Sequence, residues 1–470
     1  MNHKRQELEN KLKSIDQQHV LSFWSECSES EKNRLTEQIE NLDCDRVRQF
    51  QKLISHKSSN KPEKAQITPL PVIPLPQTPE QKKQHFQYYK TGETALKEGK
   101  VAVVLVAGGQ GSRLGFNHPK GMFPLGPVTN RSLFQYHTEK ILALERMYQT
   151  TIPFYIMTSK TNDTETRTFF NENHFFGKES SSVHFFRQNM LPAMDSMGRL
   201  LLKNKYELFT SPDGHGGTIN ALRENGLFED MDKQEVEYVF YFQVDNPLVK
   251  VCDPEYLGAH IENQAEMSAK TIYKRSWDEK LGVPVNRNGK NVVVEYSELS
   301  EDDKKSTHSN GTWVFGQGSI AIHVFRVDFL KKLTTKEKEL PIHLAHKKIE
   351  YIKPDGSRVK PEKPNAYKFE QFIFDAMPEA ANVMIMETER SKEFSPIKNK
   401  TGEDSPESAK YDLSAIFADW LQQAGVRGLF DQKGSLNQHI EIGPLFAMSA
   451  EEVAKKLPNN FKPQGDIILD

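Results

Sequence analysis

The chain has 470 residues, of which 37% are hydrophobic and 27% charged, a balance typical of soluble globular proteins. Its 62 Lys and Arg nearly balance 64 Asp and Glu, which excludes a general positive field for nucleic acid or a membrane surface. Three scattered cysteines exclude a disulfide framework, and the polar N-terminus lacks the apolar core of a signal peptide. We therefore expect a cytoplasmic protein of two or three domains; monomer or homo-oligomer is left open.

The N-terminal part predicts helices followed by a proline-rich connector. Residues 4–54 carry apolar residues at helical spacing, and Ser28 with Glu31 has the pattern of a capping box. From residue 56 to 84, prolines alternate with polar residues, which is typical of a stiff extended connector. The apolar residues around Ile73 suggest an alternative, a strap laid over the next domain. Both alternatives stay open.

After the connector, short apolar strands alternate with helices. The predicted strands are 101–106, 154–158, 183–186 and 238–244, and the predicted helices are 132–148, 164–173 and 218–226. Asp163 is placed to cap the second of these helices. Strands separated by helices indicate an α/β protein with a mostly parallel sheet and helices on both faces. Ligands of such sheets bind beyond the carboxyl ends of the strands.

The second half of the chain is more mixed. Strands are predicted at 292–296 and 320–325, and helices at 369–376 and 412–425. A last helix should begin near Ser449, with Glu452 at the capping-box position.

A glycine-rich loop carries the strongest functional signal. The strand 101–106 runs into Gly108, Gly109 and Gly111, whose backbone can approach a phosphate closely. The loop is neither a Walker loop nor the dinucleotide pattern G-x-G-x-x-G. Arg113 and Lys120 follow it, and nucleotidyl transfer needs such positioned positive charge. The two cations favour a phosphate site over a purely structural turn.

Residues 105–126, LVAGGQGSRLGFNHPKGMFPLG, resemble the signature loop of the UDP-sugar pyrophosphorylase family, most closely its N-acetylglucosamine members. The resemblance extends from about residue 79 to the C-terminus. It implies a central Rossmann-like, nucleotide-diphospho-sugar transferase (GT-A-like) mixed sheet with helices on both faces. It also implies that UTP and a sugar 1-phosphate give UDP-sugar and pyrophosphate, with Mg²⁺ as the cofactor.

By this resemblance we expect three consecutive regions. Residues 1–90 would be the helical N-terminal region with the connector, 91–395 the nucleotidyltransferase catalytic domain, and 396–470 a small α+β C-terminal domain.

The resemblance also implies a UTP site. Its residues would be Val106, Ala107, Gly108, Gly109, Gln188, Gly214, Asp245 and Lys368. The amide of Gln188 can donate and accept, as the edge of uracil requires. Asp245 follows a strand and would bind the metal, because Mg²⁺ uses one or two carboxylates together with phosphate oxygens.

Three cations are implied to carry the reaction. Arg113 and Lys120 would neutralise the departing pyrophosphate, and Lys398 would hold the sugar phosphate against the α-phosphorus of UTP. We expect direct in-line attack without a covalent enzyme intermediate, because these motifs contain no activated nucleophile.

The sugar side is implied to involve His215, Glu295, Tyr296 and Ser319. The N-acetylglucosamine enzymes carry Asn where this chain has His215, and an Asn near the sugar where it has Ser319. The glucose 1-phosphate relatives carry His at the first of these positions. We expect N-acetylglucosamine 1-phosphate as the substrate, with glucose 1-phosphate as the alternative.

The residues of the motifs disfavour two other classes of protein. A regulator that binds UTP or UDP-sugar without turnover would not need Arg113, Lys120, Asp245 and Lys398 together. A dinucleotide-dependent oxidoreductase needs an acidic residue about 20 residues beyond its glycine loop, at the end of a second strand. Glu139 lies instead in a predicted helix, which disfavours that class.

Overall fold

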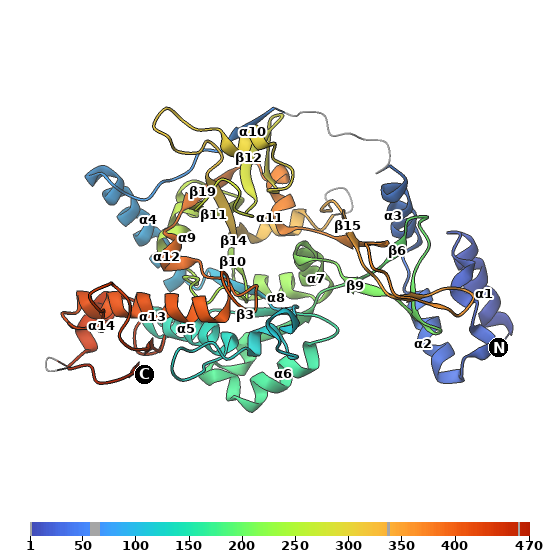
Figure 1. Cartoon of the computed structure of the whole chain (residues 1–470), viewed down its shortest axis with the longest axis horizontal. Helices are drawn as coiled ribbons and strands as arrows, with labels where there is room; N and C mark the ends of the chain where they lie inside the picture. Colours follow the sequence, from blue (N-terminus) through green and yellow to red (C-terminus); the bar gives the residue numbers. More distant parts are fainter. Residues whose placement is uncertain (1, 57–65, 336–338, 459–460) are drawn as a thin grey trace. The chain divides into compact units, whose positions relative to one another are not determined.

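The strands predicted from the first half of the chain form one sheet in the computed structural model, which describes residues 2–56, 66–335, 339–458 and 461–470. Among these residues the sheet has seven strands in the order β19-β11-β14-β10-β2-β3-β4 (Figure 1). They are β2 (Val101–Val106), β3 (Phe154–Thr158), β4 (Val183–Arg187), β10 (Tyr238–Gln243), β11 (Met267–Tyr273), β14 (Gln317–Arg326) and β19 (Val383–Glu387). Only β14 runs antiparallel to its neighbours, so the sheet is mixed.

Helices follow most strands of this sheet, which confirms the mixed α/β class. They include α4 (Pro79–Lys97), α5 (Leu133–Tyr148), α6 (Asp163–Glu172), α7 (Thr218–Glu224), α8 (Leu227–Lys233), α9 (Pro254–Glu262), α11 (Val327–Lys332) and α13 (Pro406–Gln423). Continuous apolar strands such as β2 are buried along their length, as the interior of a layered α/β protein requires. Within the described ranges, no helix combines the length and the apolar character needed to cross a membrane.

The described chain divides into two compact units. One contains Met1–Ala65, Gln188–Gly217 and Leu340–Ile373, and the other contains Gln66–Arg187, Thr218–Glu339 and Phe374–Asp470. We call them unit 1 and unit 2. The three consecutive regions expected from the sequence stay a prediction, because compactness does not show which segments fold independently.

Unit 1 packs the N-terminal helices against segments that are distant in the sequence. These helices are α1 (Asn2–Lys13), α2 (Glu29–Glu40) and α3 (Cys44–His56). The ring of Phe50 on α3 stacks on Phe369, with centroids 3.8 Å apart. Phe369 belongs to β18 (Ala366–Glu370), which pairs with β15 (His343–Lys347) and β6 (Met194–Asp195).

The connector is a strap where it is described. Within unit 2, β1 (Ile67–Pro69) pairs with β12 (Val283–Arg287), which pairs in turn with β13 (Lys290–Val294). The N–H of Ile73 donates to the carbonyl of Ile385 at 2.9 Å, so the connector extends the edge strand β19. Residues 57–65 of the predicted connector lie outside the described residues.

The capping signals at Ser28 and Ser449 predicted two helix starts correctly. The Ser28–Glu31 capping box opens α2. The Ser132 hydroxyl also caps a helix, α5, by accepting from the N–H of Gln135 at 3.1 Å, although the sequence predicted Ser132 as the first residue of that helix. Ser449 caps α14 (Ala450–Lys456). Near it, β20 (Ile440–Ile442) and β21 (Ile467–Leu469) form a small parallel pair.

Two local predictions were wrong. Asp163 is the first residue of α6 rather than its cap, because its carboxylate is engaged by the Thr158 hydroxyl at 2.6 Å and by Arg187 at 2.6 Å. The predicted helix 369–376 is instead the end of β18 followed by a 3₁₀ helix, η8 (Ile373–Glu379). Pairing of β18 with two other strands overrides the local helical pattern.

Candidate functional site

The glycine-rich loop and Asp245 begin at the same edge of the large sheet. Val106, the last residue of β2, pairs with Gln243 of β10 on one side and with Met157 of β3 on the other. All three strands are parallel, so the segments after them leave the sheet together at its carboxyl edge. Ligands of open α/β sheets bind at this edge.

The glycine-rich loop is anchored to the sheet at its start and folded back on itself. The N–H of Ala107 donates to the carbonyl of Met157 at 2.8 Å, and the N–H of Lys120 donates to the carbonyl of Gly109 at 3.1 Å. A side chain built at Gly109 would meet no atom within 4 Å, so packing does not require glycine there. The exposed backbone at Gly109 is thus free to approach a ligand closely.

Asn162, which was not predicted from the sequence, supports this loop through hydrogen bonds of its side chain. Its Nδ2 donates to the carbonyls of Ala107 at 2.9 Å and Gly109 at 3.4 Å. Its Oδ1 accepts from the N–H of Ser159 at 2.7 Å, and the residue is only 1% exposed. A polar residue that soon follows a buried strand at the carboxyl edge is the signal that could have indicated it.

Lys120 joins three segments that are distant in the sequence. It begins a short 3₁₀ turn, η4 (Lys120–Met122), and its Nζ lies 3.0 Å from the carbonyl oxygen of Ile397 and 3.4 Å from Oδ2 of Asp245. The N–H of Ile397 donates back to the carbonyl of Asp245 at 2.9 Å. Lys398 follows directly and is exposed. The structure therefore brings the predicted residues Lys120, Asp245 and Lys398 together.

Arg113 is held at the surface by the 3₁₀ turn η3 (Ser112–Leu114). It is exposed and forms no ion pair within the part of the chain that is described.

Replacing Arg113 with alanine should lower the steady-state turnover on the order of a hundredfold, by analogy with the loss of an oxyanion-hole donor. The thermal unfolding midpoint should stay within about 1 °C of wild type, because an exposed unpaired side chain contributes little stability. Unchanged turnover would exclude Arg113 from the reaction.

Asp245 fits a metal ion only in partnership with a ligand. In the described part of the chain, no group of three His, Cys, Asp or Glu residues is placed to hold a metal. Asp245 is a single carboxylate that also faces Lys120. Mg²⁺ is commonly held by one carboxylate, phosphate oxygens and water, so this arrangement suits a magnesium ion that is bound together with a phosphate.

A buried polar network fixes the segments beside Asp245. The amide of Asn246 donates to the carbonyl of Glu393 at 2.8 Å and accepts from the N–H of Ser395 at 3.1 Å. The Glu393 carboxylate is fully buried and binds the ammonium of Lys270 at 2.5 and 2.7 Å. Asp253 binds the same ammonium at 2.7 Å. The network therefore ties the loop after β10 to the segment that carries Lys398.

The predicted sugar residues of unit 2 meet around Gly282. The N–H of Ser319 on β14 donates to the carbonyl of Gly282 at 2.8 Å. A side chain built at Gly282 would lie 3.8 Å from Oε1 of Glu295. Tyr296 follows Glu295 just beyond β13 and is half-buried. The structure thus groups Ser319 and Glu295.

The remaining predicted residues, Gln188, Gly214, His215 and Lys368, belong to unit 1. Gly214 has a φ of +88°, and a side chain there would lie 2.5 Å from the carbonyl oxygen of Gln371, so the fold itself requires glycine. Gln188 is buried, and the ammonium of Lys368 on β18 lies 5.6 Å from the centre of the Phe209 ring.

His215 has a structural contact within unit 1. Its Nδ1 accepts a hydrogen bond from the N–H of Ile373 at 3.1 Å, and its ring stacks on Phe372 with centroids 5.4 Å apart. Burial lowers the pKa of His215 to about 4, so the ring is neutral at pH 7. A neutral ring can donate a hydrogen bond to a ligand, but it cannot supply positive charge.

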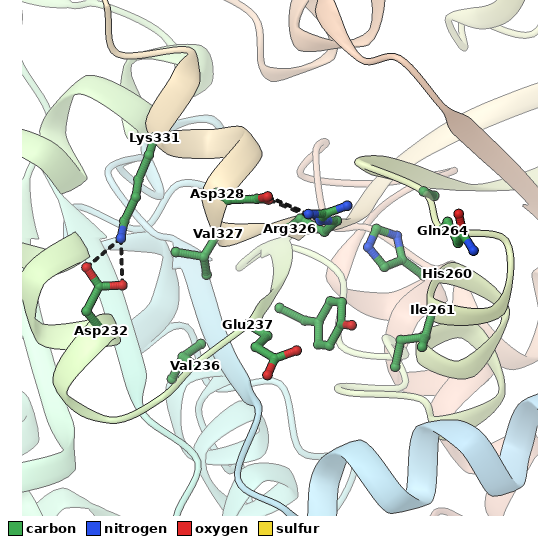
Figure 2. A pocket seen from close by; sticks show the side chains of 12 residues that line it. Asp232, Val236, Glu237, His260, Ile261, Gln264, Arg326, Val327, Asp328 and Lys331 are labelled. Atoms are coloured by element: carbon green, nitrogen blue, oxygen red, sulfur yellow. Dashed lines mark hydrogen bonds and ion pairs between the residues drawn. The ribbon is translucent and has the colours of Figure 1, made fainter.

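A separate cavity of about 460 Å³ lies at the opposite edge of the sheet (Figure 2). Tyr238, the first residue of β10, and Arg326, the last residue of β14, line it. Lys331 pairs with Asp232 there at 2.6 Å, and burial lowers the pKa of His260 to about 3. Because this cavity lies at the amino end of β10, it is not the ligand edge of the sheet.

Known proteins resemble this chain over most of its length. The family described as UTP–glucose-1-phosphate uridylyltransferase matches residues 47–416. UDP-N-acetylglucosamine pyrophosphorylase of Saccharomyces cerevisiae is 35% identical over 87% of this chain and 89% of its own length. UDP-N-acetylglucosamine diphosphorylase 2 of Arabidopsis thaliana is 35% identical over 95% of this chain and 91% of its own length. A crystal structure of uridine diphosphate N-acetylglucosamine pyrophosphorylase from Trypanosoma brucei, in complex with an inhibitor, has a TM-score of 0.85 and 28% identity, with 99% of this chain and 98% of that chain covered.

Proposed function

Because the chain belongs to the UTP–glucose-1-phosphate uridylyltransferase family, we propose that it transfers uridylyl from UTP to N-acetylglucosamine 1-phosphate and releases pyrophosphate. The family resemblance carried by the glycine-rich loop is confirmed. The observation that supports the proposal most is the junction of Lys120, Asp245 and the Ile397–Lys398 backbone at the carboxyl edge of the sheet. On this basis we assign the sheet to the Rossmann-like, GT-A-like type. A cytoplasmic location stays a prediction.

In the proposed reaction, a phosphate oxygen of the sugar 1-phosphate attacks the α-phosphorus of UTP in line. The nucleotide would contact the backbone of Val106, Ala107, Gly108 and Gly109. The side-chain amide of Gln188 would form hydrogen bonds with the edge of uracil, and the chain at Gly214 would pass close to the base. Lys120, Arg113 and Lys368 would face the phosphates, so the negative charge that develops on pyrophosphate meets fixed positive charge. Holding the two anions in reacting geometry can lower the barrier by roughly 7–11 kcal/mol in favourable cases.

Mg²⁺ is part of the proposal through Asp245. When bound with the triphosphate, the ion would neutralise phosphate charge. The carboxylate of Asp245 would hold it from the protein side, and Lys120, 3.4 Å away, would keep that carboxylate oriented.

On the sugar side, His215 and Ser319 differ from the N-acetylglucosamine pattern. These two residues favour glucose 1-phosphate as a second candidate. Glu295 would accept hydrogen bonds from sugar hydroxyls, with Tyr296 beside it.

Pyrophosphate release should be measured with UTP, Mg²⁺ and N-acetylglucosamine, glucose or galactose 1-phosphate. We expect the highest kcat/KM with N-acetylglucosamine 1-phosphate. Release with none of the three would favour a regulator without turnover.

Replacing Lys398 with alanine should raise the KM for the sugar 1-phosphate more than the KM for UTP. Lys398 is exposed, and its backbone N–H donates to the carbonyl of Asp404 at 2.7 Å. Its ammonium lies 5.5 Å from the centre of the Phe394 ring, and the exposed side chain can meet an incoming phosphate. A charge-assisted contact of this kind typically contributes about 1.5–3 kcal/mol, or roughly 10–150-fold in affinity. Initial rates with each substrate varied in turn would measure it. An unchanged KM for the sugar phosphate together with unchanged turnover would contradict this role.

A further inference from the structure

Lys274 is a buried lysine that the proposed reaction does not yet use. It is only 4% exposed, and its ammonium has no hydrogen-bond or ion-pair partner among residues 2–56, 66–335, 339–458 and 461–470. Its backbone N–H donates to the carbonyl of Gly316 at 2.8 Å, which fixes where the side chain begins. The ammonium is not among the fully buried atoms that lack a partner, so it keeps some access to solvent. A largely desolvated ammonium without an ion pair favours an anion beside it.

Lys274 lies at the ligand edge of the sheet. It follows β11 directly, and β11 and β10 are each antiparallel to β14, so they run parallel to one another. The carboxyl end of β11 therefore lies at the edge where the glycine-rich loop and Asp245 also leave the sheet.

The loop from Lys274 to Gly282 connects the two halves of the proposed sugar phosphate site. At its far end, Gly282 lies beside Glu295 and Ser319, the proposed sugar residues. Glu279 folds back on the start of the loop, where its carboxylate accepts from the N–H of Arg275 at 2.8 Å. It also accepts from Nη2 of Arg390 at 2.6 Å, and the chain beyond Arg390 leads to Lys398. If the sugar binds beside Glu295 and Ser319 at the Gly282 end of the loop, its phosphate group would lie nearer the Lys274 end.

Among the described residues, no carboxylate forms an ion pair with Lys274. Glu279 is the acidic group that acts on it electrostatically, but both oxygens of that carboxylate are engaged, one by Arg390 and the other by the N–H of Arg275 at 2.8 Å. Burial lowers the pKa of Lys274, and Lys304 adds to the lowering. An anion that binds beside the ammonium would supply the missing counter-charge.

We propose that Lys274 binds the phosphate group of the sugar 1-phosphate together with Lys398. This inference rests on the proposed function. It adds to the proposed site a substrate-binding cation that directly follows β11, whereas Lys398 belongs to the segment after Glu393.

The test is Lys274→Met, which keeps the length of the side chain and removes its charge. The KM for N-acetylglucosamine 1-phosphate should rise roughly 10–100-fold, while the KM for UTP stays within about twofold. Without ligand the variant should unfold at the same temperature as wild type or higher, because an unpaired buried charge has been removed. Lys274→Gln provides a second variant if the methionine variant does not fold.

Lys304→Met is the matched control, because Lys304 is a neighbour whose ammonium already pairs with Glu301 at 2.9 Å. It should leave both KM values unchanged. A folded Lys274 variant with an unchanged KM for the sugar phosphate would overturn the inference and leave the proposed function standing. A lower unfolding temperature with unchanged KM values would assign Lys274 a structural role instead. A wild-type protein that releases no pyrophosphate with any sugar 1-phosphate would overturn both.

Discussion

Replacing Lys120 with alanine is expected to reduce turnover of UTP and sugar 1-phosphate on the order of a hundredfold or more. The ammonium of Lys120 lies between the carboxylate of Asp245 and the carbonyl of Ile397. Its loss removes charge that the departing pyrophosphate requires. It also leaves Asp245 without its cation. The effect should appear in kcat and in kcat/KM alike, as for an interaction made in the transition state.

Lys83→Ala is the control for this experiment, since Lys83 is an exposed lysine on α4. It should leave the rate unchanged. Circular dichroism and the unfolding midpoint should show that Lys120→Ala is folded. Wild-type turnover in a folded Lys120→Ala protein would exclude this lysine from stabilising the leaving group.

The buried ion pair between Glu393 and Lys270 should contribute strongly to the free energy of unfolding. Replacing Glu393 with alanine should lower the free energy of unfolding by about 3–5 kcal/mol, because it breaks a buried ion pair from one side. Lys270 is 1% exposed and would keep only Asp253 as a carboxylate partner. Equilibrium unfolding in urea at constant pH would measure the change.

Glu389→Ala is a matched control from the same segment. Glu389 pairs with Lys392 at 2.9 Å, but both side chains are more than two-fifths exposed, so the loss should be under about 1 kcal/mol. If Glu393→Ala unfolded within about 1 kcal/mol of wild type, the buried network would not be a main support of the Asp245 loop.

Much of the sheet could be predicted because its strands are short and continuously apolar. The side chains of residues 101–106 are all apolar, so this run is expected to be a strand buried between layers. Strand β2 matches it residue for residue. The antiparallel direction of β14 could not be predicted, since strand direction depends on partners far away in the sequence. The same reason explains why residues 369–370 form a strand, where the local pattern indicated a helix.

The candidate site was predictable where residues cluster in one motif, and not where they meet across the chain. Gly108, Gly109, Arg113 and Lys120 lie within one short segment. The contact of Lys120 with Ile397 spans 277 positions, and local spacing carries no sign of it. Lys274 was not predicted, because a lone lysine in a sequence is ordinarily a solvated one. Only its burial sets it apart.

Transfer of uridylyl from UTP to a sugar 1-phosphate can be followed through both of its products. The purified protein is incubated with UTP, N-acetylglucosamine 1-phosphate and Mg²⁺, and UDP-sugar and pyrophosphate are quantified over time. We expect UDP-N-acetylglucosamine and pyrophosphate in equal amounts, with neither formed when the sugar phosphate is left out. Pyrophosphate without UDP-sugar, or no product at all, would show that this chain does not transfer uridylyl to the sugar phosphate.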